Sequence, residues 1–398
     1  MNILLAFTLL MISISSSANT TLSGDQYVAL LEERTLQWQQ AVYEQPNSLP
    51  LLSQLAPSIY RLGVYAGDLY RVSQAIGYMS RAIILAEKNN APALPQLYLS
   101  RAAMHLTLHQ FSRASYDIER AEQLGNDPPI LWLLQGELYW NLGDYNKAQG
   151  LIKKAANQAP NLRSMTRLAI FYFRTGRYEE AQKIFNDAEK HIDVTNPIQT
   201  AWYYVQWGIT YLDHQQFTQA ETYFRQATSI APNYVLALEH LAETLASQGK
   251  ITESIGYYQH VLTLSNSPEF VSALADVYKE QGDTEKANTL AEQAKTAYDE
   301  LLAFFPEAMY QHAADFYHAY GEHQTALKLL KSNTSLRPNS ESYHLLAQAQ
   351  WTMGQTAQAQ QSLLQALKGP LISPELCQLG AQVQPSKELL KQYKPNCL

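Results

Sequence analysis

Residues 134–160, LQGELYWNLGDYNKAQGLIKKAANQAP, decide the fold of this 398-residue chain. Apolar residues recur at three- and four-residue steps on both sides of a central Gly-Asp pair, which predicts two amphipathic helices joined by a short turn. Small residues, Gly136, Ala148 and Ala155, stand on the apolar faces of these helices. We therefore expect the helices to cross closely there, because large side chains would hold the backbones apart. Pro160 cannot continue a helix and ends the unit.

The same unit recurs along most of the chain. A small residue, an aromatic residue and a turn glycine return at the offsets that they have in residues 134–160. The other copies begin at Leu62, Arg101, Leu168, Trp207, Leu241, Leu274, Ala313 and Leu346. This gives nine units at spacings of 33, 34 or 39 residues. Self-similarity at a fixed period of this length is the mark of a repeat architecture.

This pattern resembles the tetratricopeptide repeat family, and the resemblance covers residues 56–370. The family's unit is a helix–turn–helix hairpin of about 34 residues. The resemblance implies an all-α fold, a right-handed α-solenoid of about nine such hairpins with capping helices at both ends. His109 and Gln215 replace the turn glycine, which weakens single repeats without breaking the fold. Residues 297–309, AYDELLAFFPEAM, predict an elongated second helix at one of the longer spacings.

The two ends of the chain differ from the repeats. Residues 1–18 carry no charged side chain, and their apolar run is too short to span a bilayer. We expect a signal peptide cleaved after Ala18, the alternative being a buried first helix, and we expect the mature protein in the periplasm without a transmembrane segment. Residues 22–50 predict an N-terminal capping helix, and residues 371–398 predict C-terminal capping helices.

The two cysteines of the chain, Cys377 and Cys397, both lie in the last segment. In an oxidising compartment they can form a disulfide that stabilises the C-terminus by about 3 kcal/mol. Two free thiols are the alternative, because sequence spacing alone does not fix disulfide geometry.

Charge and motifs exclude several classes of function. The chain has 29 Lys and Arg against 36 Asp and Glu, a net charge of −7 without basic clusters, which argues against nucleic acid as a partner. No catalytic or phosphate-binding motif is present. His105 and His109 have the spacing of a metal pair but no third ligand in view, so ordinary repeat positions explain them better. We therefore predict no enzymatic activity, no cofactor and no metal site.

The resemblance places binding residues on the first helix of each hairpin, which in this family lines the concave surface. In the middle repeats these positions are mainly apolar, with two arginines: Trp140, Arg163, Ile170, Phe173, Arg174, Trp202 and Ile209. Further along they are acidic: Glu239, Glu243, Asp276, Glu280 and Asp315. Such a surface suits an extended partner with hydrophobic and basic segments. The alternative is that several of the aromatic residues pack against the neighbouring repeat.

The expected function is a non-catalytic periplasmic scaffold that binds an extended protein segment, or a subunit of an envelope complex, in the concave groove. The alternative is a glycan-handling module that assists exopolysaccharide or cell-envelope assembly, because 26 tyrosines and 6 tryptophans can stack on sugar rings. Family members that clamp a chaperone's C-terminal carboxylate use Lys, Arg and Asn. The predicted groove offers mainly carboxylates and apolar groups, which disfavours that activity.

Overall fold

The computed structural model describes residues 22–125, 128–383 and 386–394, together with Cys397. All regular structure in these residues is helical, with 21 α-helices and one short 3-10 helix. None of these helices is long and apolar enough to cross a membrane. The predicted signal peptide, residues 1–18, lies outside the described residues.

Nine consecutive helix pairs form the solenoid in the described part of the chain. The pairs are α2 (Leu49–Ala66) with α3 (Leu69–Lys88), α4 (Leu94–Thr107) with α5 (Phe111–Gln123), α6 (Pro129–Asn141) with α7 (Tyr145–Gln158), α8 (Leu162–Arg174) with α9 (Tyr178–Ala188), α10 (Pro197–Leu212) with α11 (Phe217–Ile230), α12 (Val235–Ser247) with α13 (Ile251–Leu264), α14 (Pro268–Gln281) with α15 (Thr284–Phe304), α16 (Pro306–Ala319) with α17 (His323–Leu336), and α18 (Ser340–Thr352) with α19 (Thr356–Lys368). The predicted all-α solenoid of nine hairpins is confirmed.

Helices outside these pairs lie at both ends. Helix α1 (Gly24–Glu44) packs on α2, and α20 (Pro374–Gln382) and α21 (Ser386–Tyr393) follow α19. The expected elongated second helix is α15, which runs for 21 residues. After α9 the chain instead forms the short 3-10 helix η1 (Glu189–His191) before α10 begins.

Each of the nine hairpins turns through one residue in the left-handed backbone region. In seven hairpins this residue is glycine, for example Gly143 with φ 78°. In the other two it is His109 with φ 54° and Gln215 with φ 57°. Because a side chain crowds the left-handed region, these two turns form at a conformational cost that glycine avoids.

The small residues lie where the paired helices cross. A Cβ atom added at Gly136 would be 2.6 Å from Cγ1 of Ile152 on the partner helix. Ala148 and Ala155 are fully buried. At the equivalent position of another hairpin, a Cβ on Gly208 would be 2.6 Å from the ring of Phe224. The predicted close crossing is thus confirmed, and it explains why these positions exclude large side chains.

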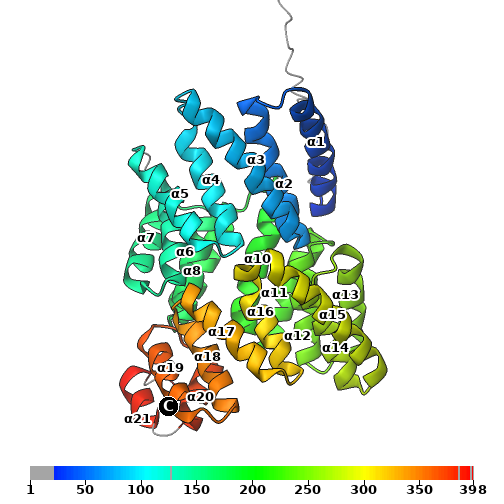
Figure 1. Ribbon diagram of the computed structural model, residues 1–398, viewed down its shortest axis with the longest axis vertical. Helices are drawn as coiled ribbons and strands as arrows, with labels where there is room; N and C mark the ends of the chain where they lie inside the picture. Colours follow the sequence, from blue (N-terminus) through cyan, green and yellow to red (C-terminus); the bar gives the residue numbers. More distant parts are fainter. Residues whose placement is uncertain (1–21, 126–127, 384–385, 395–396, 398) are drawn as a thin grey trace, which may run out of the picture.

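The solenoid winds back on itself, so that helices far apart in the sequence lie side by side. Figure 1 shows the chain passing from α1–α4 at the top through α5–α8 on the left and α12–α15 on the right, and ending with α17–α21 at the bottom left. Contacts join the first turn of the solenoid, α1–α11, to the second turn, α12–α21. The Tyr65 and Tyr234 rings stack 5.3 Å apart, and the backbone N–H of Ile372 donates to the carbonyl of Arg174 at 2.9 Å. The second turn therefore packs directly against the first.

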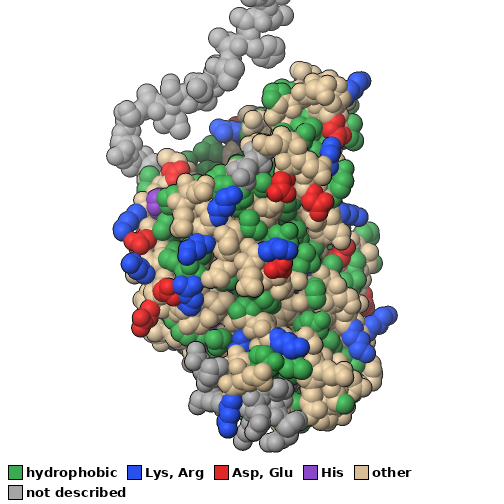
Figure 2. Space-filling model, turned by 90° about the vertical axis from the view of Figure 1, so that its left-hand side faces the viewer, with side chains coloured by type: hydrophobic (Ala, Val, Ile, Leu, Met, Phe, Trp, Pro, Cys, Tyr) green, Lys and Arg blue, Asp and Glu red, His purple; other side chains and the backbone are tan. Residues whose placement is uncertain are grey.

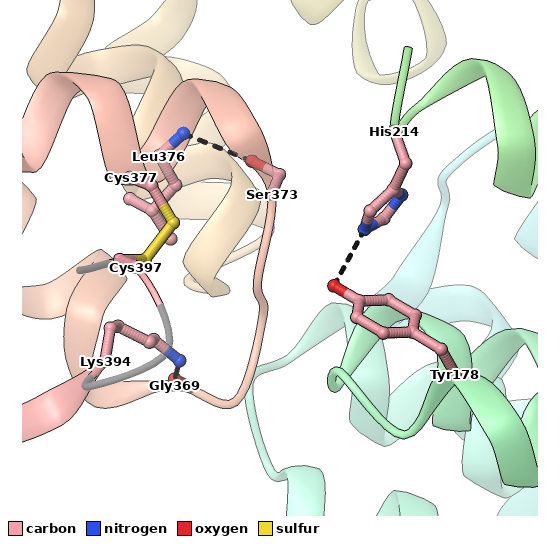
Figure 3. Close-up of a disulfide and its surroundings, with 8 residues drawn as sticks. All are labelled: Tyr178, His214, Gly369, Ser373, Leu376, Cys377, Lys394 and Cys397. Atoms are coloured by element: carbon pink, nitrogen blue, oxygen red, sulfur yellow. Dashed lines mark hydrogen bonds between the residues drawn. A yellow bond between two sulfur atoms is a disulfide. The ribbon is translucent and has the colours of Figure 1, made fainter. Parts of the chain in front are cut away.

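The C-terminal cap contains the disulfide Cys377–Cys397 (Figure 3). Of the two alternatives that the sequence left open, a disulfide or two free thiols, the structure has the disulfide. Beside it, the ammonium group of Lys394 donates to the carbonyl of Gly369, the residue that ends α19. Burial lowers the pKa of Lys394 to about 8. The disulfide and this hydrogen bond together hold the chain end against the last repeat.

Candidate functional site

Two cavities lie between the turns of the solenoid. The first, of about 370 Å³, is bordered by α6 and α8 of the first turn and by the α16–α18 region of the second. The second, of about 990 Å³, is bordered by α12, α14, α15 and α16 and by the turn between α2 and α3. Both walls include Gln311 and His312, so the two cavities adjoin. The outer face in Figure 2, by contrast, mixes positive and negative side chains.

The larger cavity is strongly acidic, and we call it the acidic cavity. One arginine, Arg71, stands in its wall among seven carboxylates: Asp68, Glu239, Glu243, Glu269, Asp276, Glu300 and Asp315. Arg71 is itself engaged, because its Nε lies 3.4 Å from Asp68 Oδ2. Aromatic rings, among them Phe270 and Tyr298, complete the wall. The cavity thus combines a negative field with apolar surface.

Burial and mutual repulsion shape the ionisation of these carboxylates. Burial raises the pKa of Asp315 to about 6 and also raises that of Asp276. Burial raises the pKa of Glu239 to about 7, although the neighbouring His240 lowers it. A cation that enters the cavity would relieve this unfavourable concentration of negative charge.

His240 lies between two of the carboxylates. Its Nδ1 is 3.0 Å from Glu239 Oε2 and 3.1 Å from Glu243 Oε2. Burial lowers the pKa of His240, but Glu239 and Glu243 raise it by more, to about 9. The ligand atoms of these three residues lie within 4.8 Å of one another, close enough to hold a metal ion. The protonated imidazole already supplies a positive charge at this point, which offsets one of the two carboxylates.

The smaller cavity has the opposite character, and we call it the arginine cavity. Its charged residues are Arg167, Arg174, Arg337, Glu137 and Glu341, and its apolar wall consists of Leu133, Trp140, Ile152, Ile170 and Phe171. Nη2 of Arg167 lies 3.5 Å from Glu137, and Nη2 of Arg174 lies 3.5 Å from Glu341. The guanidinium of Arg174 also lies 5.8 Å from the centre of the Trp140 ring.

The structure brings four of the five predicted acidic residues into the acidic cavity: Glu239, Glu243, Asp276 and Asp315. The fifth, Glu280, lies one turn beyond Asp276 on α14, is exposed, and is outside the wall. Glu280 therefore stays a predicted residue of the concave groove and does not contribute to the acidic cavity, because α14 extends past the cavity.

Of the predicted apolar set, Trp140, Ile170 and Arg174 line the arginine cavity. Arg163, Phe173, Trp202 and Ile209 lie outside both walls. The prediction for Phe173 is wrong, because its ring is buried against Tyr178 of its own hairpin and against Tyr211 and His214 of the next one. Trp202 is partly buried, with the guanidinium of Arg167 5.4 Å from its ring centre, and Arg163 is exposed.

Sequence reasoning missed the part of the arginine cavity that the second turn contributes. His109, Gln311, His312, Arg337 and Glu341 all line it. Arg337 ends α17 and Glu341 lies in the first turn of α18, so neither occupies the predicted binding face of a first helix. Only the contact between the two turns brings them to α6 and α8. No signal within a single repeat indicates this contact.

Three sequence patterns, which match four segments of the chain, support the repeat assignment together with the geometry. Sequence patterns described as tetratricopeptide repeat match residues 160–233, residues 205–268, and residues 130–161 with 340–368. This protein belongs to the tetratricopeptide repeat family. Proteins of this family are generally non-catalytic scaffolds for protein interactions.

Curated relatives of this tetratricopeptide repeat protein are distant. Human cilia- and flagella-associated protein 70 is 23% identical over 187 residues, which cover 46% of this chain and 16% of that protein. The TPR repeat-containing protein MJ1428 of Methanocaldococcus jannaschii is 22% identical over 226 residues, or 55% of this chain and 39% of that protein. The chain thus spans less than half the length of either relative.

Solved structures with a similar fold are also distant in sequence. A human IFIT1 dimer with PPP-AAAA has a TM-score of 0.48 at 15% identity, covering 86% of this chain and 88% of that one. PilW, a type IV pilus biogenesis factor, has a TM-score of 0.42 at 21% identity, covering 54% of this chain and 94% of that one.

Proposed function

We propose that this tetratricopeptide repeat protein is a non-catalytic periplasmic scaffold that holds an extended, basic segment of a protein partner in the acidic cavity. The observation that carries the proposal is the wall of that cavity, in which seven carboxylates outnumber two cations, Arg71 and the protonated His240, and both cations are already paired with carboxylates. A wall of one sign focuses the electrostatic field and attracts a ligand of the opposite sign.

The shape of the acidic cavity fits lysine and arginine side chains. Its volume of about 990 Å³ accommodates several residues of an extended chain. The long apolar stems of lysine and arginine pack well against Tyr70, an aromatic residue of the wall that is 46% exposed, while their charged ends reach the carboxylates. Binding is therefore expected to weaken as the salt concentration rises.

Two features support export. Residues 1–18 have the composition of a signal peptide. The Cys377–Cys397 disulfide is typical of an oxidising compartment. Expression of the full chain in a Gram-negative host tests this directly: we expect the protein in the periplasmic fraction with its N-terminus at Asn19. A cytoplasmic protein that retains Met1 would contradict export.

The aromatic residues favour a protein partner over a glycan. A sugar ring needs an accessible, flat aromatic face. Phe173 is buried, and the guanidinium of Arg167 lies over the ring of Trp202, so neither offers such a face.

A labelled peptide tests the scaffold hypothesis. The probe is a fluorescein-labelled, ten-residue peptide of alternating lysine and leucine, and binding is followed by fluorescence anisotropy at several salt concentrations. The cavity variant Glu243→Gln/Asp315→Asn removes two charges from the wall with little change in shape. The control variant Glu280→Gln/Glu285→Gln removes two exposed charges outside the wall.

We expect the cavity variant to bind the peptide about tenfold more weakly, with a smaller dependence on salt, since two lost charge pairs at about 0.7 kcal/mol each amount to about 1.4 kcal/mol. The control variant should bind as the wild type does. Equal effects of the two variants, or no effect of either, would place peptide binding elsewhere on the molecule.

A further inference from the structure

The arginine cavity contains a cation that the surrounding protein does not neutralise. Its wall holds three guanidinium groups and two carboxylates. Glu137 pairs with Arg167 and Glu341 pairs with Arg174. The third guanidinium, that of Arg337, has no carboxylate oxygen within 4.0 Å among the described residues.

Arg337 is a buried side chain, with only 8% of its surface exposed. Its guanidinium donates to the side-chain oxygens of Asn333, at 3.0 and 3.2 Å, and of Gln311. Both acceptors are neutral amides, which stabilise a buried positive charge less than an anion does. Burial accordingly lowers the pKa of Arg337. A buried cation with only neutral partners is a place where an anion gains binding energy.

The two histidines of the wall, His109 and His312, do not neutralise the positive charge of Arg337. His109 is neutral at physiological pH because burial, followed by Arg337 and His312, lowers its pKa to about 3. His312 lies 3.7 Å from Glu269, which belongs to the acidic cavity. Neither side chain supplies a negative charge to Arg337.

One side of the wall is apolar. The Trp140 ring packs edge-on against Phe171, with ring centres 5.2 Å apart, and Ile170 and Leu133 lie beside them. A volume of about 370 Å³ is within the range of small-molecule sites, which combine apolar walls with a few polar anchoring groups.

We propose that the arginine cavity binds a small organic monoanion, a carboxylate with an apolar body. Its carboxylate lies at Arg337 and Arg174, which belong to different turns of the solenoid, and its apolar body lies against Trp140 and Phe171. Nε and Nη2 of Arg337 already donate to Asn333 and Gln311, so its Nη1 donates to the carboxylate, and the guanidinium of Arg174 provides the second charged donor. Such a ligand would bridge the two turns. This site is separate from the acidic cavity, so either proposal can fail without the other.

Isothermal titration calorimetry with 4-phenylbutyrate and its uncharged amide tests the proposal. These probes share one apolar body and differ in the negative charge. We expect the acid to bind the full protein with a Kd of about 1 mM or tighter and the amide to bind at least about tenfold more weakly. No heat of binding for the acid, or equal affinities for the two compounds, would overturn the proposal.

Three variants locate the site. Arg337→Gln should weaken binding of the acid about tenfold or more, whereas Arg113→Gln, at an exposed arginine outside the cavity, should leave it unchanged. Glu341→Gln removes the carboxylate that competes for Arg174, so it should tighten binding by about threefold or more. Glu341→Gln therefore tests the proposed carboxylate site even if Arg337→Gln does not fold. Unchanged or weaker binding in Glu341→Gln would contradict the proposal.

Discussion

The carboxylate of Asp25 accepts hydrogen bonds from the backbone N–H of Asn233, at 3.1 Å, and from its side-chain amide, at 2.9 Å, although 208 residues separate the two. The same carboxylate accepts a third bond from the hydroxyl of Tyr65, at 2.9 Å. Asp25 lies in the first turn of α1, and Asn233 lies just before α12. The Asp25 side chain thus connects α1, where the first turn of the solenoid begins, to the segment before α12, where the second turn of the solenoid begins.

Replacing Asp25 should therefore loosen the contact between the turns. Asp25→Ala leaves three partly buried donors without their acceptor, and we expect a loss of about 2 kcal/mol in the free energy of unfolding. Chemical denaturation measures this loss, and small-angle X-ray scattering should show a larger radius of gyration. The control Glu33→Ala removes an exposed carboxylate from the same helix and should change neither quantity. Equal losses in the two variants would contradict a joining role for Asp25.

Two glycines within helices should respond in opposite directions to the same substitution. In Gly208→Ala the new methyl group would lie 2.6 Å from the Phe224 ring, so the variant should lose about 1–3 kcal/mol. In Gly256→Ala, on α13, no atom lies within 4 Å of the new Cβ. That variant should gain about 0.5–1 kcal/mol, because alanine favours a helix interior. Thermal unfolding of both variants tests whether the close crossing of helices is the reason that small residues are required. A change of melting temperature in the same direction for both variants would contradict this explanation.

The repeat unit could be predicted from sequence because each hairpin encodes its own geometry. The crossing of two helices requires small residues such as Gly136 and Gly208, and the turn between them favours glycine. Both requirements recur with the period of the unit, so they identify the fold without any contact between distant repeats. The acidic residues Glu239 and Asp315 followed from the same register, because they occupy first helices.

The arginine cavity could not be predicted in this way. It depends on the small rotation from each hairpin to the next, which accumulates over several hairpins until the second turn meets the first. Arg337 reaches the cavity of Trp140 only through this accumulated rotation. The burial of Phe173 also depends on a neighbouring repeat, since its ring packs against Tyr178 of its own hairpin and Tyr211 of the next one. Helical spacing alone does not separate such a residue from one on the open face.

Relieving the strained turn at Gln215 should stabilise the protein. Gln215→Gly removes the side chain from a left-handed residue, and we expect a gain of about 0.5–1 kcal/mol after the larger entropy of glycine in the unfolded chain is counted. The adjacent Gln216 has φ −91°, which any residue adopts. Gln216→Gly should therefore destabilise the protein. Equal effects of the two substitutions on the melting temperature would show that the turn conformation is not the cause.

The disulfide should stabilise the C-terminal cap. Cys377 and Cys397 close a loop with a sequence separation of 20, and cross-linking a loop of this length is worth about 3 kcal/mol. We expect Cys377→Ser to lose up to this amount and amide hydrogen exchange to become faster in α20 and α21. Exchange in α6 and α8 should stay as in the wild type. Unchanged protection of α20 and α21 would mean that packing alone holds the cap.

Asp315 should make the stability of the protein depend on pH. Burial raises its pKa from the ordinary value of 3.8 to about 6. The unfolded chain therefore releases this proton at lower pH than the folded chain does, so the contribution of Asp315 to stability falls as the pH rises from about 4 to about 6. Asp315→Asn removes this contribution. Measured by urea denaturation, the stability of the variant relative to the wild type should rise over the same pH range and stay constant above it.

The control for this prediction has the opposite sign. Hydrogen bonds from the hydroxyl and the backbone N–H of Thr195 lower the pKa of Asp193, so its contribution to stability is present at neutral pH and is lost in acid. Asp193→Asn should therefore lose stability relative to the wild type as the pH rises from about 2 to about 5. If both variants followed the same trend, the pH dependence would come from the general charge of the chain and not from the raised pKa of Asp315 in the acidic cavity.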